Sequence, residues 1–260
     1  MVDTTDGRVE GDVGKPNLSD VTVLVVNGIQ ACVVTDFNNT CVKSFYTRNN
    51  QPCHSRLPLV NSPWGATQLK ENQVMVAVPD YSQIVTVEVT PDLVLLSTIT
   101  TSRWYYSLAV LSPSSLAAGT YYCVDILDMG GHVLRSVDNQ IQFTRPFCMC
   151  VNNKGNILVS DCEKKSVTCV TSEGDVVWRY APTGDRALIF PCGITTTSTG
   201  DILLADRYTN KVIQLTESGE YVRDVLTSQD GVPSLRGLWS DNHGSIFVTG
   251  DGKIKEFINT

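Results

Sequence analysis

The sequence predicts an all-β protein, a six-bladed β-propeller built from four-stranded antiparallel blades. The first observation is a repeated unit, in which the apolar segment Ile202–Asp206 ends in aspartate and is followed by a polar turn and the segments Lys211–Leu215 and 221–225. The second is that equivalent segments recur about every 40 to 45 residues, the spacing of propeller blades. The third is that no stretch shows a convincing helical period.

Six such units can be placed in order along the chain. The last position of the second strand falls at Asp36, Asp80, Gly119, Asp161, Asp206 and Gly250. The run before each position is mostly apolar without alternation, as expected for a strand covered on both faces by neighbouring sheets. Gly- and Asn-containing turns at 152–155, 198–200 and 241–244 separate first from second strands. In the third unit, residues 121–124 are expected to open the third strand. The whole chain, 1–260, is predicted to form a single domain.

The two ends of the chain complement each other. The last unit stops near residue 257, at the end of its third strand, and residues 5–14 resemble the turn and outer strand of the other units. An unpaired sheet edge exposes a row of backbone groups to aggregation. We therefore expect this N-terminal strand to close the ring, with residues 8–13 paired against 253–258.

Composition sets limits on function and location. The 260 residues are 42% apolar and 18% charged, which is ordinary for a globular protein. The net charge of -7 argues against a protein that coats phosphate groups. We predict neither a signal peptide nor a membrane span, because no apolar run approaches about 18 residues. The nine cysteines, an odd number, lie mostly in apolar strand segments without zinc-ligand spacing. Reduced, buried thiols and a cytoplasmic location are therefore expected.

Strand alternation predicts which loops share a face. The loops between second and third strands and the connections between units lie together on what we name the top face, and the remaining turns lie on the bottom face. The side chains expected to bind a partner on the top face are Trp64, Arg103, Trp104, Tyr105, Arg145, Phe147, Arg207 and Arg236. Aromatic and arginine side chains most often dominate interface energies. The alternative for the aromatic residues is that they plug the mouth of the central channel.

Two other groups of residues, the repeated aspartates and the histidines, have side chains that could bind metal or take part in catalysis. Asp36, Asp80, Asp161 and Asp206 are either a carboxylate cluster on the top face or caps that accept hydrogen bonds from their own loops. The only histidines are His54, His132 and His243, and none is expected on the top face. No Ser/His/Asp or Cys/His arrangement on a shared face can be assembled. The sequence therefore predicts no catalytic residue, no metal and no cofactor, and a domain that is not itself an enzyme.

The repeat text resembles a known family. Arg145-Pro-Phe, Gly155-Asn-Ile-Leu-Val-Ser-Asp161 and the segments 190–194, 200–206 and 210–212 are similar to NHL repeats. The chain resembles the six-bladed propeller at the C-terminus of tripartite-motif ubiquitin ligases, most clearly over 145–257. This resemblance implies a partner- or substrate-recognition domain for a protein or peptide, itself monomeric and not membrane-bound. Ligase activity would lie in a RING domain outside these residues.

The same resemblance leaves two alternatives. Some NHL propellers bind single-stranded RNA on a basic top face, where arginines such as Arg103, Arg186 and Arg236 could pair with phosphates and aromatic rings could stack on bases. Acidic residues on the same loops count against this alternative. Other propeller relatives are enzymes, including calcium-dependent lactonases and a zinc-dependent amidating lyase. The lyase resemblance would imply metal-binding histidines facing the channel.

Overall fold

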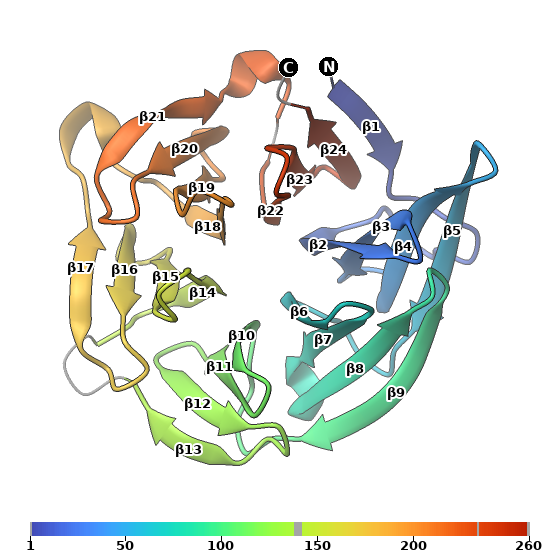
Figure 1. Ribbon diagram of the computed structural model, residues 1–260, viewed down its shortest axis with the longest axis horizontal. Helices are drawn as coiled ribbons and strands as arrows, with labels where there is room; N and C mark the ends of the chain where they lie inside the picture. Colours follow the sequence, from blue (N-terminus) through green and yellow to red (C-terminus); the bar gives the residue numbers. More distant parts are fainter. Residues whose placement is uncertain (1, 138–141, 233, 259–260) are drawn as a thin grey trace.

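The chain forms a ring of six four-stranded antiparallel sheets, as predicted (Figure 1). The structure is a computed structural model that describes residues 2–137, 142–232 and 234–258. Each sheet is one blade, with its first strand at the centre of the ring and its fourth strand at the rim. Among the described residues, no helix is long and apolar enough to cross a membrane.

The strands of the six blades follow one another along the chain. Blade 1 is β2 (Leu18–Val26), β3 (Ile29–Asp36), β4 (Cys41–Arg48) and β5 (Gln51–Pro58), and blade 2 is β6 (Ala66–Lys70), β7 (Gln73–Val78), β8 (Gln83–Val89) and β9 (Leu93–Thr100). Blade 3 is β10 (Ser107–Ser112), β11 (Ser115–Gly119), β12 (Val124–Asp128) and β13 (Val133–Ser136), and blade 4 is β14 (Pro146–Val151), β15 (Ile157–Asp161), β16 (Ser166–Val170) and β17 (Val176–Tyr180). Blade 5 is β18 (Pro191–Thr196), β19 (Ile202–Asp206), β20 (Lys211–Leu215) and β21 (Tyr221–Leu226), and blade 6 is β22 (Leu238–Ser240), β23 (Ile246–Gly250), β24 (Lys253–Phe257) and β1 (Val2–Asp6).

The hydrophobic core is divided into clusters, each between two adjacent blades. Strand β15 shows the principle, because Leu158 packs toward blade 5 whereas Ile157 and Val159 pack toward blade 3. All three side chains are fully buried. A second strand of this kind needs apolar residues on both faces, which explains the continuous apolar runs in the sequence.

The ring is closed by the N-terminal strand, but this strand lies earlier in the sequence than predicted. Strand β1 (Val2–Asp6) pairs with β24 (Lys253–Phe257), with Val2 opposite Phe257 and Asp6 opposite Lys253. Gly7 ends the strand, because its backbone N–H bonds to the carbonyl of Gly252 at 2.9 Å and a Cβ at Gly7 would lie 2.6 Å from that oxygen. Residues 8–13, which were expected to form the strand, belong instead to the connection that leads to blade 1.

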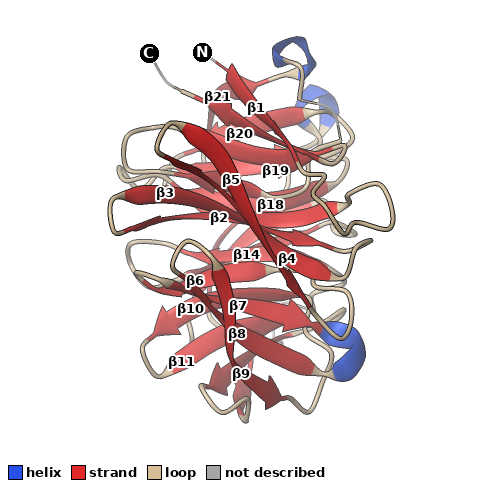
Figure 2. Cartoon of the chain, turned by 90° about the vertical axis from the view of Figure 1, so that its right-hand side faces the viewer, coloured by secondary structure: helices blue, strands red, loops and turns tan. Residues whose placement is uncertain are grey.

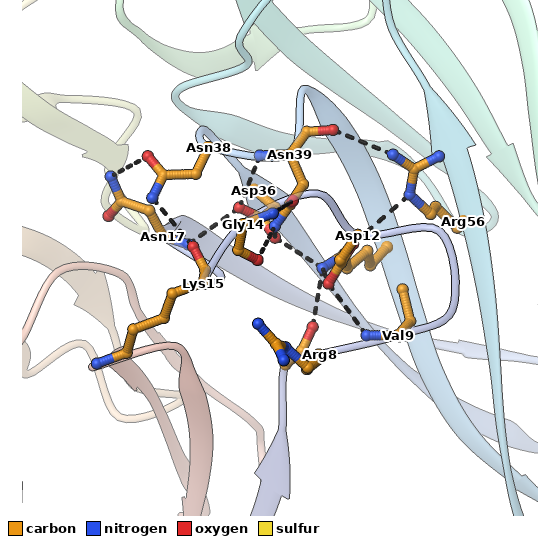
Figure 3. Close-up of polar contacts among 12 residues, drawn as sticks. Arg8, Val9, Asp12, Gly14, Lys15, Asn17, Asp36, Asn38, Asn39 and Arg56 are labelled. Carbon is orange, nitrogen blue, oxygen red and sulfur yellow. Dashed lines mark hydrogen bonds and ion pairs between the residues drawn. The ribbon is translucent and has the colours of Figure 1, made fainter.

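A buried lysine holds this connection against blade 1. Figure 3 shows the polar contacts around it, with Asp12, Asp36 and Asn39 labelled. The ammonium group of Lys43 is fully buried and donates to the carboxylates of Asp12 at 2.7 Å and Asp36 at 2.6 Å and to the carbonyl of Gly7 at 2.9 Å. Asn39 adds a hydrogen bond to Asp36 and accepts one from the backbone of Val13. One cation thus links the end of β1, the connection and blade 1.

The cysteines are buried or half-buried, as predicted. Cys32, Cys41, Cys123, Cys162, Cys169 and Cys192 are buried, Cys53, Cys148 and Cys150 are half-buried, and none is in a disulfide. Burial raises the pKa of the Cys32 thiol to about 12 and that of Cys162 to about 11. Thiols with such pKa values remain protonated at neutral pH and are poor nucleophiles.

Loss of β1 should destabilise the ring. Replacing residues 2–6 with a Gly-Ser sequence of the same length removes the strand that pairs with β24 and leaves that edge open. We expect the melting temperature to fall by several degrees, at roughly 2–4 °C for each kcal/mol lost in a protein of this size. Differential scanning calorimetry would measure the shift, with Val13→Ser, at a position 92% exposed, as the control. An unchanged melting temperature would contradict the closure shown by the strand pairing.

Removing the buried cation should cost more than a surface substitution. Lys43→Met leaves Asp12 and Asp36 buried without their partner, and the free energy of unfolding should fall by about 3–5 kcal/mol. Chemical denaturation at pH 7 would measure this. A triple variant that also carries Asp12→Asn and Asp36→Asn should recover much of the loss, because no uncompensated charge remains.

The deficit of Lys43→Met should also depend on pH. Burial acts to raise the pKa of Asp36, but hydrogen bonds from Lys43, Asn17 and Asn39 hold it below 3.8. The ionised form of Asp36 therefore stabilises the wild type above pH 3.8, and this contribution is lost as the pH falls through the folded-state pKa. The difference between variant and wild type should shrink on acidification, and a difference independent of pH would count against the ion-pair explanation.

Candidate ligand-binding site at the mouth of the ring

The top face carries the connections between blades and all three short helices, η1 (Pro79–Tyr81), η2 (Gly184–Arg186) and η3 (Ser228–Asp230). In Figure 2 the helices lie on one side of the disc. Aspartates at the ends of second strands hold some of these connections in place by accepting hydrogen bonds from their backbone. They decide where the side chains of the top face lie.

The carboxylates of Asp161 and Asp206 bind the chain that enters their own blades. Asp161 accepts hydrogen bonds from the backbone N–H groups of Thr144 at 2.8 Å and Arg145 at 3.1 Å. Asp206 accepts from Ile189 and Phe190, both at 2.8 Å. Both carboxylates are buried. For Asp161 and Asp206 the structure supports capping of local backbone rather than a shared carboxylate cluster, and the capped connections carry Arg145 and Phe190. Asp80 departs from this pattern, because β7 ends at Val78 and Asp80 lies exposed in the short helix η1.

Aromatic rings from four blades meet at the mouth of the central channel. Trp64, which precedes blade 2, makes edge-to-face contacts with Tyr106 of the next connection at 5.5 Å and with Phe147 of blade 4 at 5.9 Å between ring centroids. Phe147 in turn contacts Phe190, which precedes blade 5, at 5.3 Å. Blades 2 and 4 are not adjacent, so the contact between Trp64 and Phe147 crosses the channel entrance. The rings form a connected cluster there, as the plug alternative predicted.

Arginine side chains lie over these rings. The guanidinium of Arg145 lies 5.5 Å from the ring centre of Tyr121 and 6.0 Å from that of Phe147. Arg207 lies 6.0 Å from Phe190 and 5.7 Å from Tyr208. Such cation–π contacts orient a guanidinium while leaving its N–H groups available for a ligand. We name the connected rings with these two arginines and Arg236 the mouth cluster; its rings are Phe37, Trp64, Tyr106, Tyr121, Tyr122, Phe147, Phe190 and Tyr208.

The remaining predicted residues divide between surface and interior. Trp104 is 58% exposed, whereas Tyr105 is only 1% exposed and donates its hydroxyl to Asp125 at 2.6 Å. Arg103 is half exposed and pairs with the same buried carboxylate at 3.0 Å. Tyr105 therefore belongs to the core between blades 2 and 3 rather than to the surface, because the alternation that exposes Trp104 turns the next side chain inward.

Several aromatic residues of the mouth cluster were not among the site residues predicted from the sequence. Tyr121 and Tyr122 were expected in a strand, but β12 begins at Val124 and the two tyrosines lie in the loop before it. The hydroxyl of Thr120 accepts hydrogen bonds from the backbone of Tyr122 and Cys123, both at 3.1 Å, and holds this loop. Phe37 and Tyr208 follow Asp36 and Asp206 in the sequence within one or two positions. An aromatic residue directly after the repeated aspartate would have been the pattern that predicts them.

A surface pocket of about 410 Å³ opens beside the mouth cluster, lined by Arg103, Trp104, Tyr106, Thr120, Tyr121, Tyr122 and Cys123. Tyr122 is 73% exposed. Because Asp125 neutralises Arg103, the pocket offers flat aromatic walls and hydroxyl groups rather than net charge. Such walls suit an apolar or aromatic side chain.

Below the mouth lies the central channel, a cavity of about 290 Å³ walled by the inner strands of all six blades. Asp20 of β2 faces this cavity and accepts hydrogen bonds from the backbone of Ala66 and Val21, both at 2.9 Å. Burial raises the pKa of Asp20 to about 7, and the two backbone donors oppose that rise. Asp20 lines the channel, and the effect of burial outweighs that of the two donors.

Among the described residues, potential metal ligands gather in one group, and the histidines lie apart from the mouth. The one group of potential metal ligands in that part of the chain is Asp12, Asp36 and Cys41, and the ammonium of Lys43 already lies against both carboxylates. His132 and His243 lie in bottom-face turns, and His54 lies on the outer strand β5. The histidines are thus away from the mouth, as the sequence predicted.

Comparisons with solved structures show the propeller fold. A catalytically inactive His-to-Ala variant of virginiamycin B lyase from Staphylococcus aureus, solved with quinupristin, is 12% identical, covers 100% of both chains and has a TM-score of 0.67. A streptogramin B lyase is 11% identical over 98% of this chain and 97% of its own, with a TM-score of 0.71. The WD40 propeller domain of Doa1 is 12% identical over 99% of this chain and 97% of its own, with a TM-score of 0.64. No protein-family model and no curated protein matches the sequence.

These comparisons correct one prediction. The expectation that the domain is not an enzyme is contradicted, because the structural neighbours include lyases with the same propeller fold. At 11–12% identity the likeness shows the fold alone, and none of the three neighbours is an NHL or tripartite-motif protein. The architecture therefore defines a propeller whose function must be argued from its own side chains.

The raised pKa of Asp20 predicts a pH-dependent effect of Asp20→Asn. An acid whose folded-state pKa is about 7 and whose unfolded value is 3.8 destabilises the fold increasingly as the pH rises between these values. The stability of the variant relative to wild type should therefore increase from pH 4 to pH 7 and then level off, with a total gain on the order of a few kcal/mol at most. Denaturant titrations across this range would measure it, with exposed Asp175→Asn as the control. A difference that does not change with pH would refute the assignment.

Proposed function

We propose that this propeller is a recognition domain that binds a protein or peptide segment over the mouth of its ring. The observation that carries the proposal is the mouth cluster, in which rigid aromatic rings and guanidinium groups gather on one face and Tyr122 and Tyr208 are more than half exposed. Trp104, in the pocket beside the cluster, is also more than half exposed. Large exposed aromatic groups beside arginine are typical of interface hot spots. The finer proposal, from the NHL-like repeat text, is that this domain recognises substrates for a tripartite-motif-type ubiquitin ligase.

A peptide fits the mouth better than single-stranded RNA does. RNA binding draws its affinity from several cations that each neutralise a phosphate. Here Arg103 already pairs with Asp125, and Arg145 lies 3.6 Å from Glu163. The net charge of -7 adds long-range repulsion of a polyanion. The aromatic surface is therefore better suited to side chains of a peptide.

Affinity selection would test the proposal without knowledge of the partner. The immobilised propeller is offered two synthetic libraries of random nonapeptides, one with free C-terminal carboxylates and one C-terminally amidated, and retained peptides are sequenced by mass spectrometry. We expect specific retention, and a loss of at least about tenfold in affinity for the best peptide in Trp104→Ala. Leu134→Ala, a position 59% exposed on the outer strand β13, is the matched control and should leave affinity unchanged.

Two outcomes would overturn the proposal. One is that neither library yields a peptide that depends on Trp104. The other is that a labelled twelve-nucleotide uridine RNA binds instead, with the steep fall in affinity at increasing salt that phosphate contacts produce.

A further inference from the structure

Two arginines at the mouth, Arg207 and Arg236, lie on connections whose backbones both bond to the segment 190–193. Arg207 follows β19, and Arg236 precedes β22 in the connection to blade 6. Both are half-buried. The pKa of Arg236 is lowered first by burial and next by the positive charge of Arg207. Within the described residues, no ion pair joins either guanidinium to a carboxylate.

The carboxylate next to Arg207 in the sequence, that of Asp206, already accepts hydrogen bonds from other groups. Asp206 precedes Arg207 in the chain, but both oxygens of its buried carboxylate accept backbone hydrogen bonds from Ile189 and Phe190. The Nε atom of Arg207 is buried and has no hydrogen-bond partner. Two like charges and an unsatisfied donor in a partly desolvated place destabilise the free protein. An anion bound there would relieve both.

The backbone on which the pair is built is fixed. The N–H of Arg207 donates to the carbonyl of Phe190 at 3.0 Å, and the carbonyl of Arg236 accepts from Gly193 at 2.9 Å. Gly193 must be glycine there, because a Cβ would lie 2.5 Å from the carbonyl oxygen of Arg236. Since the rings of Phe190 and Tyr208 also flank Arg207, its guanidinium and the backbone of Arg236 are held in place before a ligand arrives.

We propose that Arg207 and Arg236 form a subsite for a carboxylate of the bound peptide, so that the mouth selects acidic peptides. This inference rests on the proposed function. A carboxylate matches the planar N–H fork of a guanidinium in a bidentate way. The uncharged pocket beside Trp104 and Tyr122 would hold an apolar side chain of the same peptide. The carboxylate comes either from an Asp or Glu side chain or from the C-terminus of the peptide.

The two libraries distinguish these sources. Enrichment of Asp or Glu in the peptides retained from the amidated library indicates a side-chain carboxylate. Retention confined to the free-acid library indicates a C-terminal carboxylate. Both outcomes support the subsite. Retained peptides with no acidic preference in either library overturn it and leave the proposed function standing, whereas the absence of any retained peptide refutes the proposed function itself.

Variants of the pair give the decisive measurement. Binding of the best acidic peptide to Arg207→Gln and Arg236→Gln should weaken at least about tenfold, and most of that loss should disappear when the acid of the peptide is replaced by its amide. Arg236→Lys, which keeps the charge without the fork, should retain part of the affinity. Lys154→Gln, in a bottom-face turn, is the control.

The same variants keep the test independent of folding. Loss of one of two neighbouring positive charges should leave the melting temperature of Arg236→Gln unchanged or raise it. A folded Arg236→Gln protein that binds the acidic peptide with wild-type affinity would overturn the proposal. A single-stranded RNA that competes with the peptide and loses affinity in both glutamine variants, with a steep salt dependence, would overturn it in favour of a phosphate subsite.

Discussion

Ring closure depends on the hydrogen bonds and ion pairs that the ammonium group of Lys43 makes. A propeller must join its last blade to its first, and here β1 completes blade 6 before residues 7–17 cross to blade 1. Lys43 binds the carbonyl of Gly7 and the carboxylates of Asp12 and Asp36, and thereby fixes the point at which the chain passes from one blade to the other. Buried charges are tolerated only when such partners satisfy them. The apolar cluster between blades 6 and 1 then packs as the other five do.

Closure in turn decides where variation is possible. Once six sheets pack face to face, the inner strands are committed to the clusters between blades, and exposed side chains lie on the outer strands and the loops. The capping aspartates hold those loops in defined places, and residues such as Arg145 and Phe190 follow from that placement. The hydrogen bonds that Asp161 and Asp206 accept thus place the part of the mouth cluster contributed by blades 4 and 5.

The likeness to lyases and to a WD40 domain shows how little the architecture says about chemistry. Similar rings serve an enzyme in one case and a WD40 domain of Doa1 in another, at nearly the same low identity to this chain. In the present molecule, guanidinium groups lie over aromatic rings at the mouth, and the described top-face loops contain no histidine. Function depends on such side chains rather than on the ring that carries them.

The repeat period and the apolar strands were enough to predict the number of blades and the all-β class, because strand burial and turn chemistry are local and recur at a fixed spacing. Capping was one of two predictions for the repeated aspartates; it holds for Asp161 and Asp206, whereas Asp80 lies exposed in η1. Strand alternation assigns Trp64, Arg145 and Phe147 to one face, and in the structure Phe147 contacts both of the others. The sequence could not place the closing strand, since the pairing of β1 with β24 joins opposite ends of the chain and a shift of a few residues changes no local pattern.

Tertiary structure alone decided which side chains meet at the mouth. The inward turn of Tyr105, the contact between Arg145 and Tyr121 and the bonding of the Arg207 and Arg236 connections to residues 190–193 join residues distant in sequence. Asp125 binds both Tyr105 and Arg103 from a different strand, and no periodicity in the sequence reveals that contact. Repeats specify the scaffold locally, whereas a binding surface is assembled only when the ring closes.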